Sequence, residues 1–529
     1  MVSLLSFMIQ LSKLGLRETV MNDKNHKLDN IPLFQHLIAF ANTGPQSYHV
    51  PGHRNGNIYE QLVTSFPDEQ QRYIAALATL AKLDVTELSH TDDLHDPQGI
   101  IQQAQQLTAN LYGADHSLFL VGGSTAGNVA LVLTLCNPGD TIIVQRNVHK
   151  SVMNGCKLGE VNAVFLVPEL DEETDLAVIP SLAVLEEAIQ QHPEAKAVFL
   201  TNPNYYGLSV ELEPYIQLAH RYNIPLVVDE AHGAHYGIAP YSPNSGLASG
   251  ADAVVQSAHK TLPALTMGAY LHIQGERIQV NDVQRQLAML ESSSPSYLLM
   301  TSLDIARALH QACGKEMFQQ SFQLREQLLQ WLDRRSSRLT IKQISPSSKV
   351  RQDPYRLLLY DRLKGASGAQ LQNMLEQQGI WVEMSVSHYA VLVWHMAMND
   401  HQLQQLQQGI IQVEQQLNQK LLEDTNDDDV SSNPNMRQSK SINAKLAVSA
   451  PVQFKRKIQL DTTFLELDQA EGYCCAEQVI PYPPGIPILF EGELITDEHI
   501  AEIRRYMAND TRFQGAERLN QGMIKVFVQ

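Results

Sequence analysis

A lysine near the middle of the chain stands in a setting suited to covalent chemistry. Lys260 follows Ser257 and His259 in the segment QSAHKT (256–261), at the end of an apolar run. A lysine amine can form a Schiff base with an aldehyde cofactor, and the serine and histidine are near enough to reach the same small ligand. Taken alone, the segment also fits a surface lysine after a strand, so its interpretation depends on other motifs.

A carboxylate upstream of this lysine is a second candidate for the same site. Asp229, in VVDEAHGAH (227–235), ends a predicted strand, where open α/β sheets gather their ligands. A buried carboxylate there can pair with a protonated pyridine nitrogen and keep the ring able to accept electrons. The alternative is an ordinary helix N-cap aspartate. Asp229 and Lys260 together are more specific than either residue alone.

A glycine-rich turn supplies a possible anion site. The segment VGGSTAGN (121–128) runs from a predicted strand into a predicted helix and carries Ser124 and Thr125. Backbone amides and hydroxyls at a helix N-terminus suit a phosphate group. A tight turn with an N-cap serine is the alternative, because such turns are common.

A histidine follows the next predicted strand. His149, in RNVHKS (146–151), begins a helix on the same edge of the sheet. An imidazole there can stack on a cofactor ring and lie near a substrate carboxylate or a carbon that is being protonated. A lone histidine is more often structural, so this interpretation rests on the other motifs.

Short apolar runs alternate with helix-length segments and predict the elements that position these residues. Continuous apolar character in runs such as PLVV and AVFL is typical of strands buried on both faces. We therefore expect an α/β fold, a doubly wound and mostly parallel seven-stranded sheet. The expected strands are 116–121, 140–145, 163–169, 197–202, 225–231, 253–259 and 268–273.

The rest of the chain divides by pattern into further regions. Amphipathic helices at 316–333 and 401–421, with strands at 355–360 and 379–384, predict a smaller α+β domain. An Asp-, Asn- and Ser-rich stretch predicts a disordered insertion, and PYPPGIP predicts a rigid loop. The expected divisions are 1–20 (extension), 21–115 (active-site loops), 116–314 (large domain), 315–421 (small domain), 422–447 (insertion) and 448–529 (C-terminal region).

Composition narrows the classes of partner. The formal net charge of −18 disfavours nucleic acid, since it repels phosphate backbones. The five cysteines form no CxxC pair and show no metal-ligand spacing, so we expect no disulfide framework, no metal and a reducing cytoplasm. No apolar run approaches the roughly 20 residues that a membrane span requires.

Eight motifs in order resemble a known family. The chain is similar to the ornithine/lysine/arginine decarboxylases of the aspartate-aminotransferase fold (fold type I), in particular to their shorter bacterial branch. The resemblance covers about residues 30–420 and 450–500. The motifs are PGHRNG (51–56), DDLHDPQG (92–99), GGSTAGN (122–128), RNVHKS (146–151), PNYYG (203–207), DEAHGAH (229–235), SAHKTLPALTMGAY (257–270) and PYPPGIP (481–487).

The resemblance implies a role for each candidate residue. Lys260 would carry pyridoxal 5′-phosphate, Asp229 would pair with its pyridine nitrogen, His149 would stack on the ring and His232 would be a neighbour of the cofactor. The phosphate would be held by Ser124, Thr125, Ser257 and His259. The family also implies at least a homodimer, with PGHRNG and DDLHDP reaching the site of the partner.

Some positions depart from the family pattern. Met267 stands where glutamine is usual, Tyr473 stands where arginine is common, and Ser89 and His90 form a less typical approach to DDLH. The residues expected to hold the cofactor are intact, so these departures concern substrate choice.

The implied reaction is decarboxylation of a basic amino acid to the amine, in polyamine biosynthesis. On resemblance to the shorter branch, arginine ranks before lysine and ornithine. Recognition of a distal cation requires a carboxylate, and Glu477 is the candidate, with a surface glutamate as the alternative. Two other functions stay open: another type I reaction, such as transamination or aldol cleavage, and a non-catalytic cofactor-binding paralogue with a regulatory role.

Overall fold

The computed structural model describes most of the chain. The described residues are residue 28 and the ranges 30–424, 447–456, 460–482, 486–508 and 511–528. The extension expected at 1–20 lies outside them. Most of the insertion expected at 422–447 also lies outside, although helix α16 (Asp400–Asp424) covers its first three residues. Residues 483–485 of the proline-rich segment are likewise outside.

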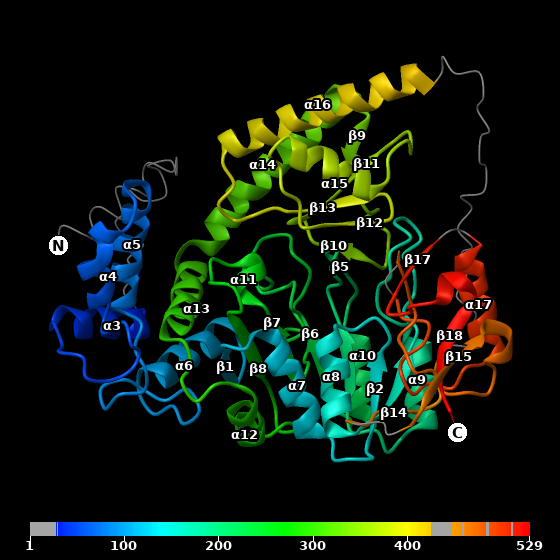
Figure 1. The fold of residues 1–529 in the computed structure, drawn as a ribbon, viewed down its shortest axis with the longest axis horizontal. Helices are drawn as coiled ribbons and strands as arrows, with labels where there is room; N and C mark the ends of the chain where they lie inside the picture. The colour runs from blue at the N-terminus through cyan, green and yellow to red at the C-terminus, as the bar shows by residue number, and fades with distance from the viewer. Residues whose placement is uncertain are drawn as a thin grey trace.

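A central sheet organises the large domain (Figure 1). Within the described residues it has eight strands in the order β1-β8-β7-β6-β4-β2-β3-β14. The seven predicted strands are all present as β1 (His116–Leu120), β2 (Thr141–Gln145), β3 (Asn162–Leu166), β4 (Val198–Thr201), β6 (Leu226–Asp229), β7 (Ala253–Gln256) and β8 (Ala269–Ile273).

The eighth strand comes from the C-terminal region and was not predicted. β14 (Val452–Gln453) pairs antiparallel with β3 and is too short to show a periodic pattern. Parallel pairing joins β3, β2, β4, β6 and β7, whereas β1 and β8 pair antiparallel. The carboxyl ends of the parallel strands therefore meet at one edge of the sheet.

Helices cover both faces of this sheet, as the continuous apolar runs predicted. Along β2, Ile142 and Val144 pack against one helical layer, while Ile143 packs against the other. Alternation of this kind is what a strand buried on both sides requires. One layer contains α7 (Gly123–Leu135), α8 (Lys150–Gly159) and α12 (Val280–Leu290), and the other contains α9 (Leu182–Gln191) and α10 (Glu213–Arg221).

The small domain follows a long helical segment. In the described chain it contains a four-stranded antiparallel sheet in the order β12-β13-β11-β9, with α15 and α16 packed nearby (Figure 1). The helical segment consists of α13 (Tyr297–Leu309), the π-helical turn η2 (His310–Gly314) and α14 (Lys315–Arg334). The elements that follow it are β9 (Leu339–Ile341), β11 (Arg356–Asp361), α15 (Gly368–Gln377), β12 (Met384–Val386) and β13 (Tyr389–Val393).

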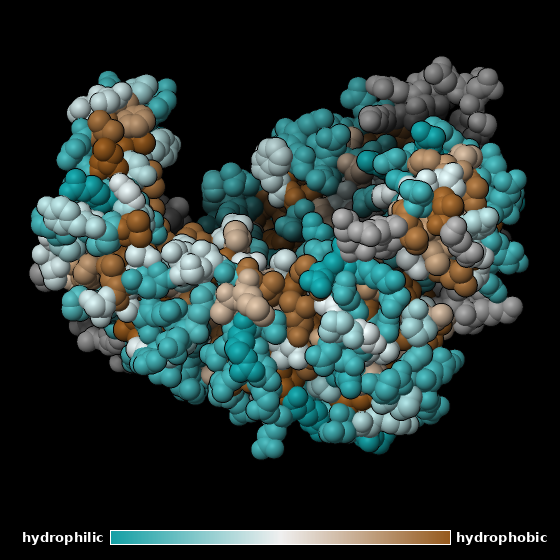
Figure 2. All heavy atoms as spheres, turned by 60° about the horizontal axis from the view of Figure 1, so that its bottom comes forward, coloured by the Kyte–Doolittle hydropathy of each residue, from teal (hydrophilic) through white to brown (hydrophobic). Residues whose placement is uncertain are grey.

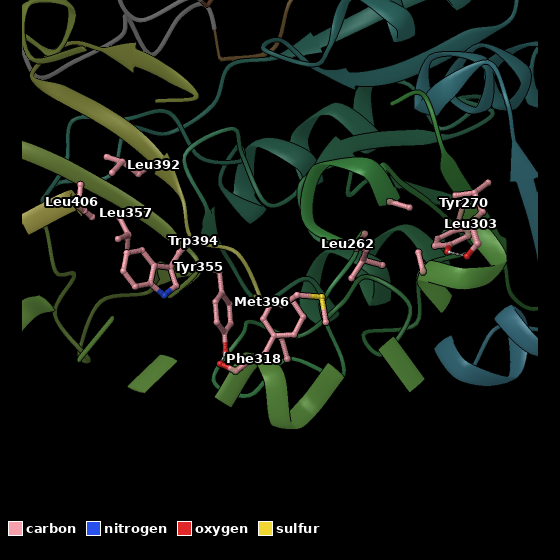
Figure 3. Packing of buried hydrophobic residues seen from close by; sticks show 14 of the residues in the cluster. Leu262, Tyr270, Leu303, Phe318, Tyr355, Leu357, Leu392, Trp394, Met396 and Leu406 are labelled. Atoms are coloured by element: carbon pink, nitrogen blue, oxygen red, sulfur yellow. Dashed lines mark hydrogen bonds between the residues drawn. The ribbon is translucent and has the colours of Figure 1, made fainter. Parts of the chain in front are cut away.

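The strand expected at 355–360 is confirmed as β11, but the one expected at 379–384 is wrong. The strand there, β12, begins only at Met384. Gly379 has a left-handed φ of 76° and closes the turn after α15, so the residues after it form a connection. Buried side chains join this sheet to the helices: Trp394 Nε1 donates a hydrogen bond to Ser321 O at 2.8 Å, and Figure 3 shows the surrounding packing.

A two-stranded pairing fastens the small domain to the large one. β5 (Leu208–Ser209) of the large domain pairs antiparallel with β10 (Arg351–Gln352), just before β11. The backbone amide of Asp353 also donates a hydrogen bond to Gly207 O at 2.7 Å. These bonds fix the start of β11 against the large domain.

The C-terminal unit (452–528) rests against the outer edge of the sheet. Its contact includes a buried ion pair in which Arg146 Nη2 lies 2.7 Å from Glu493 Oε2. The Arg146 guanidinium also lies over the rings of Phe165 and Phe490. Besides β14, the unit contains β15 (Thr462–Glu466), η4 (Leu467–Gln469), β16 (Ile480–Tyr482), α17 (Asp497–Met507), β17 (Arg512–Gln514), η5 (Leu519–Gln521) and β18 (Met523–Phe527).

An N-terminal lobe projects from the opposite side of the molecule. Figures 1 and 2 show it standing apart from the body, with hydrophobic side chains on its surface. It contains α3 (Pro32–Asn42), α4 (Asn57–Leu62), η1 (Val63–Ser65) and α5 (Asp68–Ala81), and α6 (Ile100–Tyr112) leads back to the sheet.

Candidate active site

Polar residues gather where the parallel strands end. Asp229 is the last residue of β6, and Ser257 follows β7 directly. The short helix α11 (Ala258–Thr261), which carries His259 and Lys260, comes next. Because these strands run in the same direction, the folding of the sheet brings the side chains to one edge.

Asp229 is buried and held by several donors. It is 2% exposed, and Asn128 Nδ2 donates to its Oδ2 at 2.9 Å, while the Ala231 amide donates to its Oδ1 at 3.1 Å. Asn128 also donates to Ser151 Oγ at 2.9 Å. A carboxylate bonded in this way is kept in one orientation and can accept a proton-bearing partner on the open side.

His149 belongs to the same network. It caps α8, and its Nδ1 accepts a hydrogen bond from the Ser151 amide and lies 2.8 Å from Ser151 Oγ. Burial lowers the pKa of His149, although the Asp229 carboxylate opposes this effect. The imidazole is therefore neutral near pH 7, since the ordinary pKa of histidine is already about 6.5.

Lys260 lies against a buried imidazole. Its Nζ is 2.9 Å from His232 Nε2, and His232 Nδ1 is 3.2 Å from Arg356 Nη2. Tyr205 packs edge-on against His232, with ring centroids 5.0 Å apart. Burial, with the Arg356 charge as a smaller contribution, lowers the pKa of Lys260 below its usual value of about 10.5, while Asp229 opposes the shift.

The glycine-rich turn lies beside this cluster. Ser257 Oγ donates a hydrogen bond to Ser124 Oγ at 2.9 Å, so the two hydroxyls expected at a phosphate site are adjacent. Helix α7 begins at Gly123, and its N-cap residue, Gly122, has no side chain to cap it. Glu291 Oε1 accepts a hydrogen bond from the Gly122 amide at 2.6 Å, and the amides of the helical turn that follows can bind an anion. Thr125 is exposed on the first turn.

His259 is held beside the same turn. Its Nδ1 lies 3.0 Å from Gly268 O, and its backbone amide donates to the same oxygen. Met267, the residue that stands where glutamine is usual, has a left-handed φ of 76°, and its carbonyl oxygen faces Gly123.

The structure does not bring Glu477 into this group. Its Oε1 accepts a hydrogen bond from the Lys525 amide at 2.9 Å, and its Oε2 accepts one from the Glu517 amide at 3.3 Å, both within the C-terminal unit. Tyr473 lies in that unit too. The role expected for Glu477 at the far end of a substrate therefore has no geometric support from these contacts.

Four residues at the site were not singled out from the sequence. Asn128, Ser151 and Tyr205 lie inside quoted motifs, but a single sequence gives no reason to prefer them to their neighbours. Arg356 carried a usable signal, because a cation at the start of the apolar run RLLLY is unusual in a buried strand. That arginine is 2% exposed.

Several other features limit the chemistry of the described residues. They contain no cluster of three or more His, Cys, Asp or Glu side chains that could hold a metal ion. The five cysteines are free thiols. No helix in this part of the chain is long and apolar enough to cross a membrane.

The donor set fits pyridoxal phosphate. Two buried oxygens beside Asp229, Asn128 Oδ1 and Thr201 Oγ1, have no hydrogen-bond partner in the described structure, which suits a site that receives a polar ring. The paired serine hydroxyls and the start of α7 suit a phosphate. A lysine, a buried carboxylate and an anion cradle at one edge of this α/β sheet define the class: pyridoxal-phosphate enzymes of fold type I.

Comparison with known proteins identifies the family within that class. The model of the Orn/Lys/Arg decarboxylase major domain matches residues 31–358, and the model of the C-terminal domain of the same family matches residues 435–525. The chain belongs to the Orn/Lys/Arg decarboxylase family and is a pyridoxal-phosphate-dependent amino-acid decarboxylase.

Individual relatives agree with this assignment. The chain is 37% identical to the uncharacterized protein YaaO of Bacillus subtilis, over 94% of this chain and 99% of that protein. It is 30% identical to arginine decarboxylase of the same organism, over 94% and 97% of the two chains. The structure of the constitutive lysine decarboxylase of Escherichia coli has the same fold, with a TM-score of 0.72, 20% identity and coverage of 95% and 82%.

The serine pair leads to a prediction about cofactor affinity. We expect Ser257→Ala to raise the dissociation constant of pyridoxal phosphate about 10- to 100-fold, because a hydrogen bond to a charged group contributes roughly 1.5–3 kcal/mol. The measurement is an absorbance titration of the apoprotein. Thr134→Ala is the control: Thr134 lies on α7, the helix that carries Ser124, but its hydroxyl donates to Ala130 O, and affinity should not change. An unchanged dissociation constant in Ser257→Ala would remove this serine from the phosphate site.

Proposed function

We propose that this enzyme decarboxylates arginine, in preference to lysine and ornithine, and releases the corresponding amine for polyamine synthesis. The observation that carries the proposal is the grouping of Lys260, Asp229 and His149 at the sheet edge in a chain of this family. Arginine is favoured because relatives that match nearly the whole chain at 28–30% identity are named arginine decarboxylases. The lysine decarboxylases with solved structures are only 18–20% identical.

The side chains divide the work of the reaction. Bound pyridoxal phosphate supplies the electron sink for the bond that breaks at the substrate α-carbon. Asp229, oriented by Asn128, would hold a proton on the pyridine nitrogen and keep that nitrogen cationic. Ser124, Ser257 and the start of α7 would hold its phosphate.

Two groups can handle the proton that replaces the carboxylate. His149 lies in the network of Asp229 on the edge where the ring would stack, and Lys260 lies beside His232. Either can deliver a proton to the α-carbon once carbon dioxide has left. Because His149 is neutral near pH 7, it must first take up the proton that it delivers.

The central test is carbon dioxide release from arginine, lysine and ornithine with added pyridoxal phosphate. Lys260→Ala should abolish turnover and the long-wavelength absorbance of lysine-bound cofactor, because the variant has no amine to carry it. Lys349→Ala is the control: Lys349 is an exposed lysine of the segment between β9 and β10, and its loss should leave both signals near the wild-type level. A keto acid or an aldehyde as product, in place of an amine and carbon dioxide, would overturn decarboxylation.

We assign recognition of the distal cation to Glu383 in place of Glu477. The Glu383 carboxylate opposes the lowering of the pKa of both Lys260 and Arg356, so it lies within electrostatic reach of the site. It is exposed, just before β12, and can meet an incoming side chain. Both oxygens of Glu477, in contrast, accept backbone amides.

The two glutamates form a matched pair for a test. We expect Glu383→Gln to raise KM for arginine about 10-fold with little change in kcat, since a charged hydrogen bond to the guanidinium is lost in the ground and transition states alike. Glu477→Gln should leave KM for arginine, lysine and ornithine unchanged. The opposite pattern would return the role to Glu477.

The N-terminal lobe supports assembly of at least a homodimer. On α5, Tyr73, Leu77 and Leu80 are 62%, 42% and 52% exposed at i, i+4 and i+7, so one face of the helix is apolar and uncovered. On α4, Ile58 and Leu62 are likewise exposed, at i and i+4. Contiguous exposed apolar residues of this kind mark interaction sites, and a second copy is the commonest partner.

Light scattering can test this assembly. Leu77→Glu with Leu80→Glu should shift the mass toward the 59.1 kDa monomer, because two buried carboxylates without partners would disfavour the interface. Ala75→Glu adds a charge to the opposite, exposed face of α5 and should leave the mass unchanged. A wild-type protein that is already a monomer would contradict the proposal.

A further inference from the structure

The two hydrogen bonds of the His232 ring restrict the protonation state of Lys260. His232 is 5% exposed and lies between two groups that both carry positive charge in water. Lys260 Nζ is 2.9 Å from its Nε2, and Arg356 Nη2 is 3.2 Å from its Nδ1. Two cations on the two nitrogens of one buried ring are an unusual arrangement, and the arginine is the less adaptable of the two.

Arg356 determines the direction of the hydrogen bond at His232 Nδ1. A guanidinium has five N–H donors and no acceptor, and it does not lose its proton in proteins. His232 Nδ1 must therefore accept the hydrogen bond from Arg356. A neutral imidazole that accepts at Nδ1 carries its proton at Nε2, so the tautomer of His232 is fixed.

The tautomer of His232 in turn determines the direction of the hydrogen bond between its Nε2 and Lys260 Nζ. His232 Nε2–H donates a hydrogen bond, and the atom that receives it is Lys260 Nζ. An ammonium group has three donors and no acceptor, whereas a neutral amine offers a lone pair. Both hydrogen bonds can exist together only when Lys260 is neutral.

The fold gives Arg356 little freedom to leave this position. It is the first residue of β11, directly after the β5–β10 pairing, and its backbone amide donates to Asp353 O. Gly207 has φ of 78°, and a Cβ there would lie 2.4 Å from Arg356 Cβ, so only glycine leaves room for this arginine. The Nε and Nη1 atoms of Arg356 have no hydrogen-bond partner in the described structure.

We propose that Arg356 is a positioning residue that sets the tautomer of His232 and thereby holds Lys260 as a free amine near neutral pH. The free amine is the form that condenses with the cofactor aldehyde: its lone pair forms the C–N bond, and the carbonyl oxygen leaves as water with the two amine protons. This inference rests on the proposed function only in taking pyridoxal phosphate as the aldehyde.

The surrounding charges agree in direction. Burial lowers the pKa of His232 well below its ordinary value, and the Arg356 charge acts in the same direction, which keeps the ring neutral. Arg356 also lowers the pKa of Lys260, so the free amine persists to lower pH than in water. Titratable groups from several elements face Lys260, His232 and Arg356. They are Asp229 from β6, Glu383 from before β12, Tyr205 from the loop before β5, His149 from the N-cap of α8, His259 from α11, Asp353 from between β10 and β11, Tyr236 from the segment after β6 and His395 from after β13.

A substitution pair can test the role of Arg356 without substrate. Arg356→Gln offers His232 an acceptor as well as a donor, whereas Arg356→Lys keeps a cationic donor. The readout is the rate at which the apoprotein attaches pyridoxal phosphate, followed by absorbance from pH 5 to 10. We expect the midpoint of this profile to rise by about one pH unit or more in Arg356→Gln, which is roughly a 10-fold loss of free amine below the midpoint. In Arg356→Lys the midpoint should lie close to the wild-type value, because the cationic donor is kept.

Two measurements on the wild-type apoprotein do not depend on a variant that folds. Nitrogen-15 NMR of labelled histidine should show His232 with an unprotonated Nδ1 and a protonated Nε2. Acetylation by acetic anhydride should modify Lys260 at a lower pH than the exposed Lys455. A proton on Nδ1, equal pH profiles for the two lysines, or an unshifted midpoint in Arg356→Gln would each overturn the proposal.

The result can be separated from the fate of the proposed function. All of these measurements use apoprotein and pyridoxal phosphate, with no amino acid present. A protein that shows the expected tautomer and profile but releases no carbon dioxide would retain the Arg356 inference and lose decarboxylation. A protein that releases carbon dioxide but carries a proton on His232 Nδ1 would retain decarboxylation and lose the Arg356 inference.

Discussion

Burial of the central sheet on both faces is the constraint on which the site depends. Strand residues such as Ile142, Ile143 and Val144 are wholly inaccessible and alternate between two helical layers, so the sheet interior has no room for unpaired polar groups. Polar chemistry is displaced to the strand ends, where backbone amides and helix starts can satisfy it. Because β2, β4, β6 and β7 run parallel, their ends meet, and Asp229 and the Lys260 helix become neighbours.

A second constraint comes from the small domain. Arg356 belongs to β11, yet its guanidinium lies against His232 of the large domain, and the β5–β10 pairing holds the two parts together at that point. A donor-only cation beside a buried imidazole decides which nitrogen holds the proton. The protonation state of Lys260 is therefore linked to the way the two domains pack, and not only to the residues around it in the sequence.

The C-terminal unit supports the site from the other edge. β14 extends the sheet beyond β3, and the Arg146–Glu493 ion pair is almost fully buried between the two units. Arg146 lies three residues before His149, in the segment that joins β2 to α8. Removing one partner of such a pair costs about 3–5 kcal/mol, because the other charge is left buried and uncompensated. The C-terminal unit thus fixes the segment that carries His149.

The sequence by itself determined seven of the eight described strands of the central sheet and the residues at their ends. Buried strands leave apolar runs that end in polar residues, so the sequence placed Lys260, Asp229, His149 and the Ser124 turn at strand ends, while their expected roles rested on the motifs taken together. Contacts between distant segments were decided only by tertiary structure: β14, the Asn128 bond to Asp229, and Arg356 at His232, 124 residues away. The carboxylate for the substrate shows the same limit, because Glu477 and Glu383 look alike in sequence. Only folding decides that the oxygens of Glu477 accept hydrogen bonds from backbone amides, whereas Glu383 lies near enough to influence the charge of Lys260.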